Sequence, residues 1–100
     1  MLTPEGKVKA QVKKVLSRHG AYYHCPVQNG MGAMTLDFVG CHCGKYFTVE
    51  TKAPGKHPTP RQLMTMEQVD KAGGKCFVVS NDVQLAVLDN WLDDAAHEGK

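Results

Sequence analysis

The stretch Thr35–Lys52, TLDFVGCHCGKYFTVETK, decides how this chain folds. Two short runs of β-forming residues, 36–39 and 46–49, lie on either side of a segment bracketed by Gly40 and Gly44. Glycine gives the backbone the freedom that a tight reversal requires, so the pattern is typical of a β-hairpin. We therefore expect an antiparallel hairpin here, with the rest of the chain packed around it.

Three charged residues, Asp37, Glu50 and Lys52, interrupt these apolar strands. Glu50 and Lys52 share a face because side chains alternate along a strand, and a turn with an even number of residues would bring Asp37 to that face. Two carboxylates held opposite or diagonal to each other repel unless a proton or a cation lies between them. A few hard oxygen ligands suit Mg²⁺ or Mn²⁺. The pattern predicts a metal site, with an ordinary charged surface hairpin as the alternative.

Length and composition favour a single globular domain spanning residues 1–100. A chain of 100 residues is long enough to bury one core and too short for two. No apolar run approaches the roughly 18 residues that a membrane span needs, and residues 1–4 do not open a signal peptide. We expect a cytoplasmic protein without a membrane partner, in which the four cysteines remain thiols.

Charge is distributed unevenly along the chain. Residues 1–61 contain nine Lys or Arg and three Asp or Glu, whereas residues 62–100 contain three and seven. A basic half beside an acidic half favours a polyanionic partner on one side of the molecule, although a solvated lysine-rich helix face gives the same composition.

The first helix is predicted to begin after Thr3, a good N-cap, with Pro4 at the first helical position. Apolar residues recur at helical spacing over an arc of about 100°, and His19 with Gly20 ends the pattern. Glu5 falls inside this arc, so its carboxylate points toward the core side, although the helix dipole alone would also favour an acid there. The rest of the helix is basic: Lys7, Lys9, Lys13, Lys14 and Arg18.

A second helix is predicted from Pro60, with Thr59 as N-cap and Gln62 completing a capping box. Gln62 also projects inward on the helical wheel, so its capping role and a role in a site both stay open. The expected buried stripe of this helix is Leu63, Met66 and Val69.

Strands at 21–27 and 75–79 and a last helix from 81 or 82 to about 96 complete the pattern. The predicted order is α-β-β-β-α-β-α. This is an α/β fold in which helices flank a mixed sheet with a central antiparallel hairpin.

Five motifs follow one another between Thr3 and about Leu92: TPEGKVKAQVKKVL, LDFVG, VETKAPG, PTPRQ and KAGGKCFVV. In this order they resemble the VRR-NUC family, the virus-type replication–repair nucleases of the PD-(D/E)XK superfamily. The resemblance implies a restriction-endonuclease-like core and metal-dependent hydrolysis of phosphodiester bonds in DNA. Two features depart from the family pattern: Leu36 takes the place of the usual proline, and Met31–Met34 lacks an arginine often found in relatives.

The resemblance also implies a role for each site residue. Asp37, Glu50 and the backbone carbonyl of Thr51 would hold Mg²⁺ or Mn²⁺, and Glu5 would complete the metal shell directly or through water. Lys52 would orient the attacking water or help to deprotonate it, and would stabilise charge at the phosphate.

Gln62 would position the water or the scissile phosphate for an in-line displacement. Flanking phosphates would be held without reading of the bases by Lys7, Lys9, Lys13, Lys14, Lys56 and Arg61.

The expected substrate is branched DNA. Standalone members of the family resemble resolvases that cut four-way (Holliday) junctions in phage replication, recombination and repair, whereas fused members act on flaps or crosslink intermediates. No additional domain for recognising a flap is present in this sequence. Flap or nicked DNA remains the alternative substrate.

Other classes of function are weaker interpretations. A zinc-stabilised binding module would draw on His24, Cys25, His42, Cys76 and the Cys41-x-Cys43 pair, whose spacing is shorter than the C-x₂₋₄-C of structural zinc sites. A catalytically inactive DNA-binding protein would not need the five site residues, and a cysteine nucleophile would need an inward Cys–His pair.

The last helix predicts a homodimer. Its apolar residues, between Val83 and Ala96, spread over roughly 220°, whereas a helix with one buried side needs about 100°. The excess would form an exposed apolar patch of the kind that marks an interface, unless another part of the chain covers it. Two active sites related by a two-fold axis also suit the cutting of opposing strands of a junction.

Overall fold

The computed structural model describes residues 2–27 and 36–98. Over these residues the elements follow the predicted order α-β-β-β-α-β-α, and no helix among them is long and apolar enough to cross a membrane. The predicted glycine-containing loop at 28–34 lies outside the described residues. The elements are α1 (Pro4–Arg18), β1 (Tyr22–His24), β2 (Phe38–His42), β3 (Lys45–Thr51), α2 (Pro60–Lys71), β4 (Lys75–Val79) and α3 (Asp82–Glu98).

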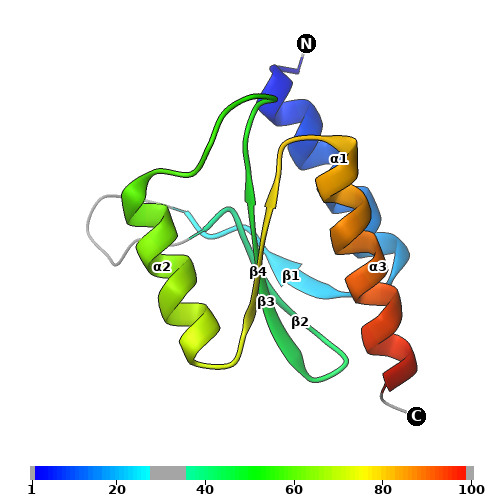
Figure 1. Ribbon diagram of the computed structural model, residues 1–100. Helices are drawn as coiled ribbons and strands as arrows, with labels where there is room; N and C mark the ends of the chain where they lie inside the picture. Colours follow the sequence, from blue (N-terminus) through cyan, green and yellow to red (C-terminus); the bar gives the residue numbers. More distant parts are fainter. Residues whose placement is uncertain (1, 28–35, 99–100) are drawn as a thin grey trace.

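The four strands form one mixed sheet in the order β1-β2-β3-β4, in which β3 and β4 run parallel and the other neighbours antiparallel. Figure 1 shows the sheet between two helical layers, with α2 on one face and α1 and α3 on the other. This is the predicted α/β arrangement. Strand β3 lies inside the sheet and is buried from Phe47 to Thr51, so the charged Glu50 has been taken into the interior.

The turn between β2 and β3 consists of Cys43 and Gly44, whose φ angles are 52° and 81°. A two-residue turn with two positive φ angles matches the twist of the strands that it joins. The register pairs Phe38 with Val49, and one further step along the ladder sets Asp37 opposite Glu50. The even-numbered turn that the metal-site prediction requires is therefore present.

Gly40 has a different role from the one that the sequence suggests. It lies inside β2, and a Cβ atom added to it would come within 2.1 Å of the Tyr22 carbonyl oxygen and 2.8 Å of Phe47 Cζ. Contacts this short are not tolerated. Gly40 is therefore needed for close packing between β1 and the core. Of the two glycines, only Gly44 lies in the turn.

The predicted starts of α1 and α2 are confirmed. The Thr3 hydroxyl oxygen accepts a hydrogen bond from the Gly6 N–H at 3.0 Å. At α2 the Thr59 hydroxyl oxygen accepts from the Gln62 N–H at 3.2 Å, and the Gln62 side-chain oxygen accepts from the Thr59 N–H at 2.9 Å. These bonds satisfy N–H groups that have no partner within the helix.

Two local predictions were wrong. Strand β1 covers Tyr22–His24 and not 21–27; Pro26 follows closely, and a proline has no N–H to continue a ladder. Helix α2 contains no buried residue: Leu63 is 52 % exposed, and Met66 and Val69 are only half-buried. The reason is that α2 is the one helix that the described residues place on its face of the sheet (Figure 1), so no second described helix packs against its outer side.

The hydrophobic core lies between the sheet and the pair α1 and α3. It fixes the inner strands against two helices that cross the same face, so the ends of β2 and β3 are held rigidly relative to α1. Its buried members are Val8, Val12, Val15, Leu16, Phe38, Phe47, Val49, Phe77, Val79, Leu88 and Leu92.

Candidate active site

Asp37 and Glu50 meet at the end of the hairpin that lies away from the turn. The Asp37 N–H donates to Glu50 Oε1 at 3.3 Å. Burial raises the pKa of Glu50, and the charge of Asp37 raises it further, while Lys52 acts in the opposite direction. The two carboxylates are therefore close enough to repel each other, as the sequence predicts, and their site favours a proton or a cation.

Thr51 holds the Asp37 side chain. Its N–H and its hydroxyl both donate to Asp37 Oδ2, at 2.9 and 2.6 Å. The family resemblance gives Thr51 a role only through its backbone carbonyl, so sequence reasoning missed this hydroxyl. A hydroxyl-bearing residue at the buried end of an apolar strand was the available signal.

Lys52 and Gln62 converge on the other oxygen of Glu50. Lys52 Nζ lies 3.4 Å from Glu50 Oε2, and the Gln62 side-chain amide donates to the same oxygen at 2.9 Å. Because the Gln62 oxygen also accepts from the Thr59 N–H, one side chain both caps α2 and contacts the carboxylate. The two interpretations that the sequence left open are thus compatible.

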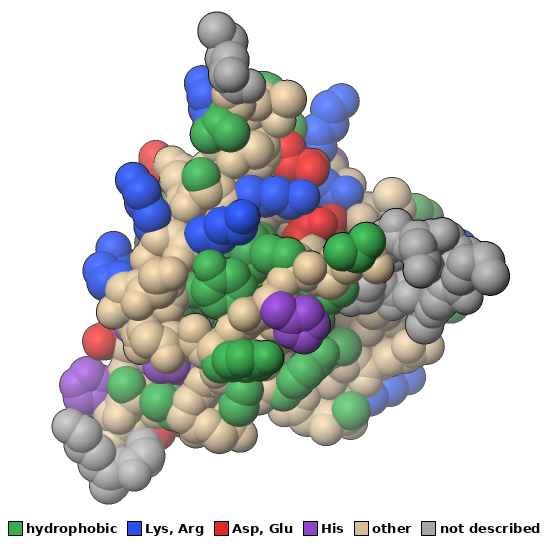
Figure 2. Space-filling model, turned by 180° about the vertical axis from the view of Figure 1, so that it is seen from behind, with side chains coloured by type: hydrophobic (Ala, Val, Ile, Leu, Met, Phe, Trp, Pro, Cys, Tyr) green, Lys and Arg blue, Asp and Glu red, His purple; other side chains and the backbone are tan. Residues whose placement is uncertain are grey.

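Lys9 belongs to this site geometrically. Its Nζ lies 3.8 Å from Asp37 Oδ1, and its side chain is 42 % exposed. The other predicted phosphate-binding residues are exposed: Lys7, Lys13, Lys14, Lys56 and Arg61. Figure 2 shows acidic side chains bordered by Lys and Arg on one face of the molecule, a distribution that suits a polyanion bound over a carboxylate site.

Glu5 is half-buried in the first turn of α1. No hydrogen bond or ion pair joins it to another described residue. Within residues 2–27 and 36–98 no three His, Cys, Asp or Glu side chains are grouped closely enough to hold a metal ion. Among the described residues the structure therefore does not bring Glu5 into one cluster with Asp37 and Glu50, and its role in a metal shell, directly or through water, stays a prediction.

The residues at the hairpin end nevertheless fit a divalent cation. Glu50 is 3 % exposed and lies beside the charge of a second carboxylate, an arrangement that costs free energy. Lys52 offsets part of this cost, but the pKa of Glu50 is still raised. The oxygens are hard donors, and Mg²⁺ is commonly held by one or two carboxylates together with water and substrate phosphate. Asp37, Glu50 and the Thr51 carbonyl would hold the ion.

The described cysteines do not provide a zinc site. Cys25, Cys41 and Cys43 are exposed, and Cys76 is half-buried, where burial raises the pKa of its thiol. His42 is buried and its Nε2 lies 3.0 Å from the Leu92 carbonyl oxygen. None of the described cysteines belongs to a group of three possible ligands.

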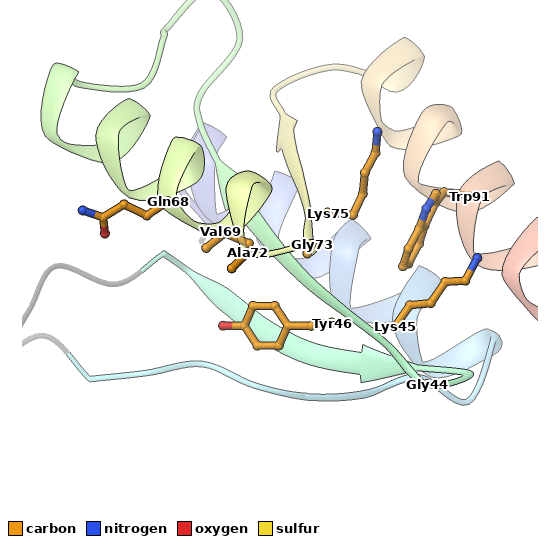
Figure 3. Close-up of a pocket in the computed structure, with 10 residues that line it drawn as sticks. Gly44, Lys45, Tyr46, Gln68, Val69, Ala72, Gly73, Lys75 and Trp91 are labelled. Carbon is orange, nitrogen blue, oxygen red and sulfur yellow. The ribbon is translucent and has the colours of Figure 1, made fainter.

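A cavity of ≈ 830 Å³ lies at the opposite end of β3, next to the hairpin turn. Figure 3 shows Tyr46 beneath the end of α2 near Val69 and Ala72, with Lys45, Lys75 and Trp91 on the other side. Neither carboxylate of the hairpin end lines this cavity. The chemistry of the carboxylates, and not the size of a hollow, therefore identifies the candidate site.

Helix α3 is apolar over a wide arc, as the sequence indicates, and the structure divides that arc. Leu88, Leu92 and Ala95 are buried, and Trp91 packs edge-on against Phe77 and Phe47. Val83 and Val87 remain 75 % and 55 % exposed. Val87 lines a shallow hollow together with residues of β4, which is an edge strand of the sheet.

No family profile matches the chain, and no curated protein matches it. Among solved structures, one described as "VRR_NUC domain" superposes with a TM-score of 0.73 and is 27% identical in sequence, covering 86% of this chain and 94% of that chain. The shared fold extends over nearly the whole of both. This likeness supports the recognition of the chain as a member of the VRR-NUC family.

Proposed function

We propose that this protein is a nuclease of the PD-(D/E)XK type that hydrolyses phosphodiester bonds in DNA with Mg²⁺ or Mn²⁺. The observation that carries the proposal is the pairing of Asp37 with Glu50, whose buried carboxylate has Lys52 Nζ at 3.4 Å. The likeness to a VRR_NUC domain supports the same reaction class.

Each residue has a proposed task in the hydrolysis. Asp37, Glu50 and the Thr51 carbonyl bind the cation, which when present lowers the pKa of water and offsets charge at the phosphate. The Lys52 ammonium orients the attacking water, and Gln62, held by Thr59 and Glu50, fixes the position of the water or the phosphate. Glu5 would complete the metal shell, directly or through water.

DNA is the proposed partner, bound along the basic surface of α1 and the start of α2. Exposed lysines and Arg61 suit phosphate contacts, which position a duplex without reading its sequence. Branched DNA, and a four-way junction in particular, is the proposed substrate. Flap or nicked DNA is the alternative substrate.

A homodimer is part of the proposal. Val83 and Val87 leave an apolar strip exposed beside the edge strand β4, and a second copy would cover it. Two active sites related by a two-fold axis could then act on opposite strands of one junction.

The test is cleavage of labelled junction, flap and duplex DNA with Mg²⁺, with Mn²⁺ or with chelator. We expect cleavage only with the metals, fastest on the junction, and its loss in Asp37→Ala, Glu50→Ala and Lys52→Ala proteins that keep their circular dichroism. Full cleavage in excess chelator, or wild-type rates in all three variants, would refute the proposal.

A further inference from the structure

The two oxygens of the Asp37 carboxylate have different surroundings. Oδ2 accepts two hydrogen bonds from Thr51, from its N–H at 2.9 Å and from its hydroxyl at 2.6 Å. Oδ1 faces the Lys9 ammonium at 3.8 Å. One oxygen is thus tied to the protein interior, while the other is directed toward positive charge.

Thr51 is well placed to impose this orientation. It is 0 % exposed and lies at the end of β3, where its register partner is Val79 and the next N–H, of Lys52, donates to the Val79 carbonyl at 3.0 Å. Asp37 by contrast lies one residue before β2, and its N–H donates to the side chain of Glu50 at 3.3 Å. The rigid partner is Thr51, and the residue that needs to be fixed is Asp37.

We propose that the Thr51 hydroxyl is a positioning group that locks the Asp37 carboxylate and presents Oδ1 to the divalent cation. This inference rests on the proposed nuclease function. It gives Thr51 a second task, through its side chain, in addition to the main-chain carbonyl.

The physical reason is that a freely rotating carboxylate must lose side-chain entropy when it binds an ion, whereas a carboxylate already held by donors does not. Groups that donate hydrogen bonds to a metal-binding carboxylate hold it in the orientation that the metal requires. Their loss typically weakens metal affinity or activity by about 10- to 100-fold. The Thr51 N–H is kept in any substitution except proline, so variants at this position change the side chain and leave the main-chain donor in place.

Three variants separate the hydroxyl from the packing of the side chain. Thr51→Val replaces the hydroxyl by a methyl group, Thr51→Ala removes it without placing a methyl group beside the carboxylate, and Thr51→Ser keeps it. Manganese binding is measured without DNA, from the loss of the electron paramagnetic resonance signal of free Mn²⁺ during titration. Thermal unfolding without metal reports any effect on packing.

We expect Mn²⁺ affinity to fall by about 10-fold or more in the Val and Ala variants and to stay within about threefold of wild type in the Ser variant. The Mg²⁺ concentration for half-maximal cleavage should rise in parallel. A purely structural hydroxyl would lower the melting temperature but leave Mn²⁺ affinity unchanged.

The outcomes distinguish this inference from the function on which it rests. If the wild type binds Mn²⁺ and cuts DNA while folded Val and Ala variants bind Mn²⁺ equally well, the positioning role is refuted and the nuclease assignment stands. Equal weakening in all three variants, including the Ser variant that keeps the hydroxyl, would assign the effect to packing of the side chain as a whole and would also overturn the inference. A wild type that neither binds Mn²⁺ nor cuts DNA would overturn the proposed function, and the inference with it.

Discussion

The Gln62 side chain bridges a helix end and a buried carboxylate: its oxygen accepts from the Thr59 N–H at 2.9 Å, and its amide donates to Glu50 Oε2, also at 2.9 Å. The start of α2 is therefore coupled to the candidate site through one residue. A substitution at Gln62 affects both, whereas a substitution at the N-cap affects only the helix.

This coupling gives the first prediction. Gln62→Leu should lower cleavage by about 10-fold or more, because the donor to Glu50 is lost, and should destabilise the fold. Thr59→Ala is the matched control, since it removes the capping hydroxyl at a cost of about 1 kcal/mol and leaves the Gln62–Glu50 bond in place. Melting curves and single-turnover cleavage check both variants; equal cleavage by the two would show that Gln62 acts only as a cap.

Lys9 gives the second prediction, because its ammonium lies at the Asp37 oxygen that we assign to the cation. Lys9→Met removes a competing positive charge, so Mn²⁺ should bind more tightly, by a few-fold for a pair this exposed. Lys13→Met, at an exposed position of the same helix, should leave Mn²⁺ affinity unchanged. Both variants should lower the affinity for DNA. Both should also make that affinity depend less steeply on salt concentration, because one phosphate contact is lost. Identical Mn²⁺ affinities in the two variants would place Lys9 outside the site.

The third prediction concerns the metal-free protein, in which Asp37 and Glu50 repel each other. Asp37→Asn should raise the metal-free melting temperature by a few degrees, which corresponds to a gain of about 1 kcal/mol or less in the free energy of unfolding. Added Mg²⁺ should stabilise the wild type more than the variant. Asp94→Asn, at an exposed position of α3, is the control and should change neither value.

The pH dependence of this advantage follows from the raised pKa of Glu50. A folded-state pKa above the unfolded value gives stability that is present at low pH and is lost as the pH rises through the folded pKa. Asp37→Asn removes one cause of the raised value. Its advantage over wild type should therefore be larger near neutral pH than at about pH 4. A variant no more stable than wild type at either pH would contradict the clustering of the carboxylates.

The fourth prediction concerns a contact that joins α1 to α3. Arg18 Nη2 lies 2.8 Å and His19 Nε2 lies 2.5 Å from Asp89 Oδ1. The hydrogen bond with His19, followed by that with Arg18, lowers the pKa of Asp89. The stability from a lowered carboxyl pKa is present above the unfolded value and is lost as the pH falls through the folded pKa.

Asp89→Asn should therefore be less stable than wild type near neutral pH, and the two melting temperatures should converge in acid, below the normal carboxyl range. Asp94→Asn again serves as the control, because no ion pair with a described residue involves Asp94. A constant difference between Asp89→Asn and wild type across the acid range would show that the charge of Asp89 is not responsible.

The fifth prediction tests the homodimer. Val87→Glu should shift the molecular mass measured by light scattering from twice the chain mass toward the monomer, since a charge would be buried in the proposed interface. Leu88→Glu would not be informative, because Leu88 is fully buried in the core and the change would unfold the chain. Val27→Glu, at a residue that is 88 % exposed and distant from α3 in sequence, is the control. A wild-type monomer that cuts both strands of a junction would refute the dimer.

The sequence by itself determined the parts of this protein that depend on local rules. Helix caps at Thr3 and Thr59, the hairpin and the order of elements follow from residue types that act over three or four positions. The placement of Asp37 opposite Glu50 could also be predicted from the sequence, because a two-residue turn and the alternation of side chains along a strand fix the register.

Tertiary structure decided what lies between elements that are distant in sequence. The approach of Lys9 to Asp37 depends on the packing of α1 against the sheet. The exposure of Leu63 depends on the lack of a second helix beside α2 in the part of the chain that the structure describes. Leu88 and Val87 are adjacent in the sequence and equally apolar, but one is buried and the other exposed. Periodicity defines the face of a helix, whereas the width of the face that is covered depends on the other elements that pack against it.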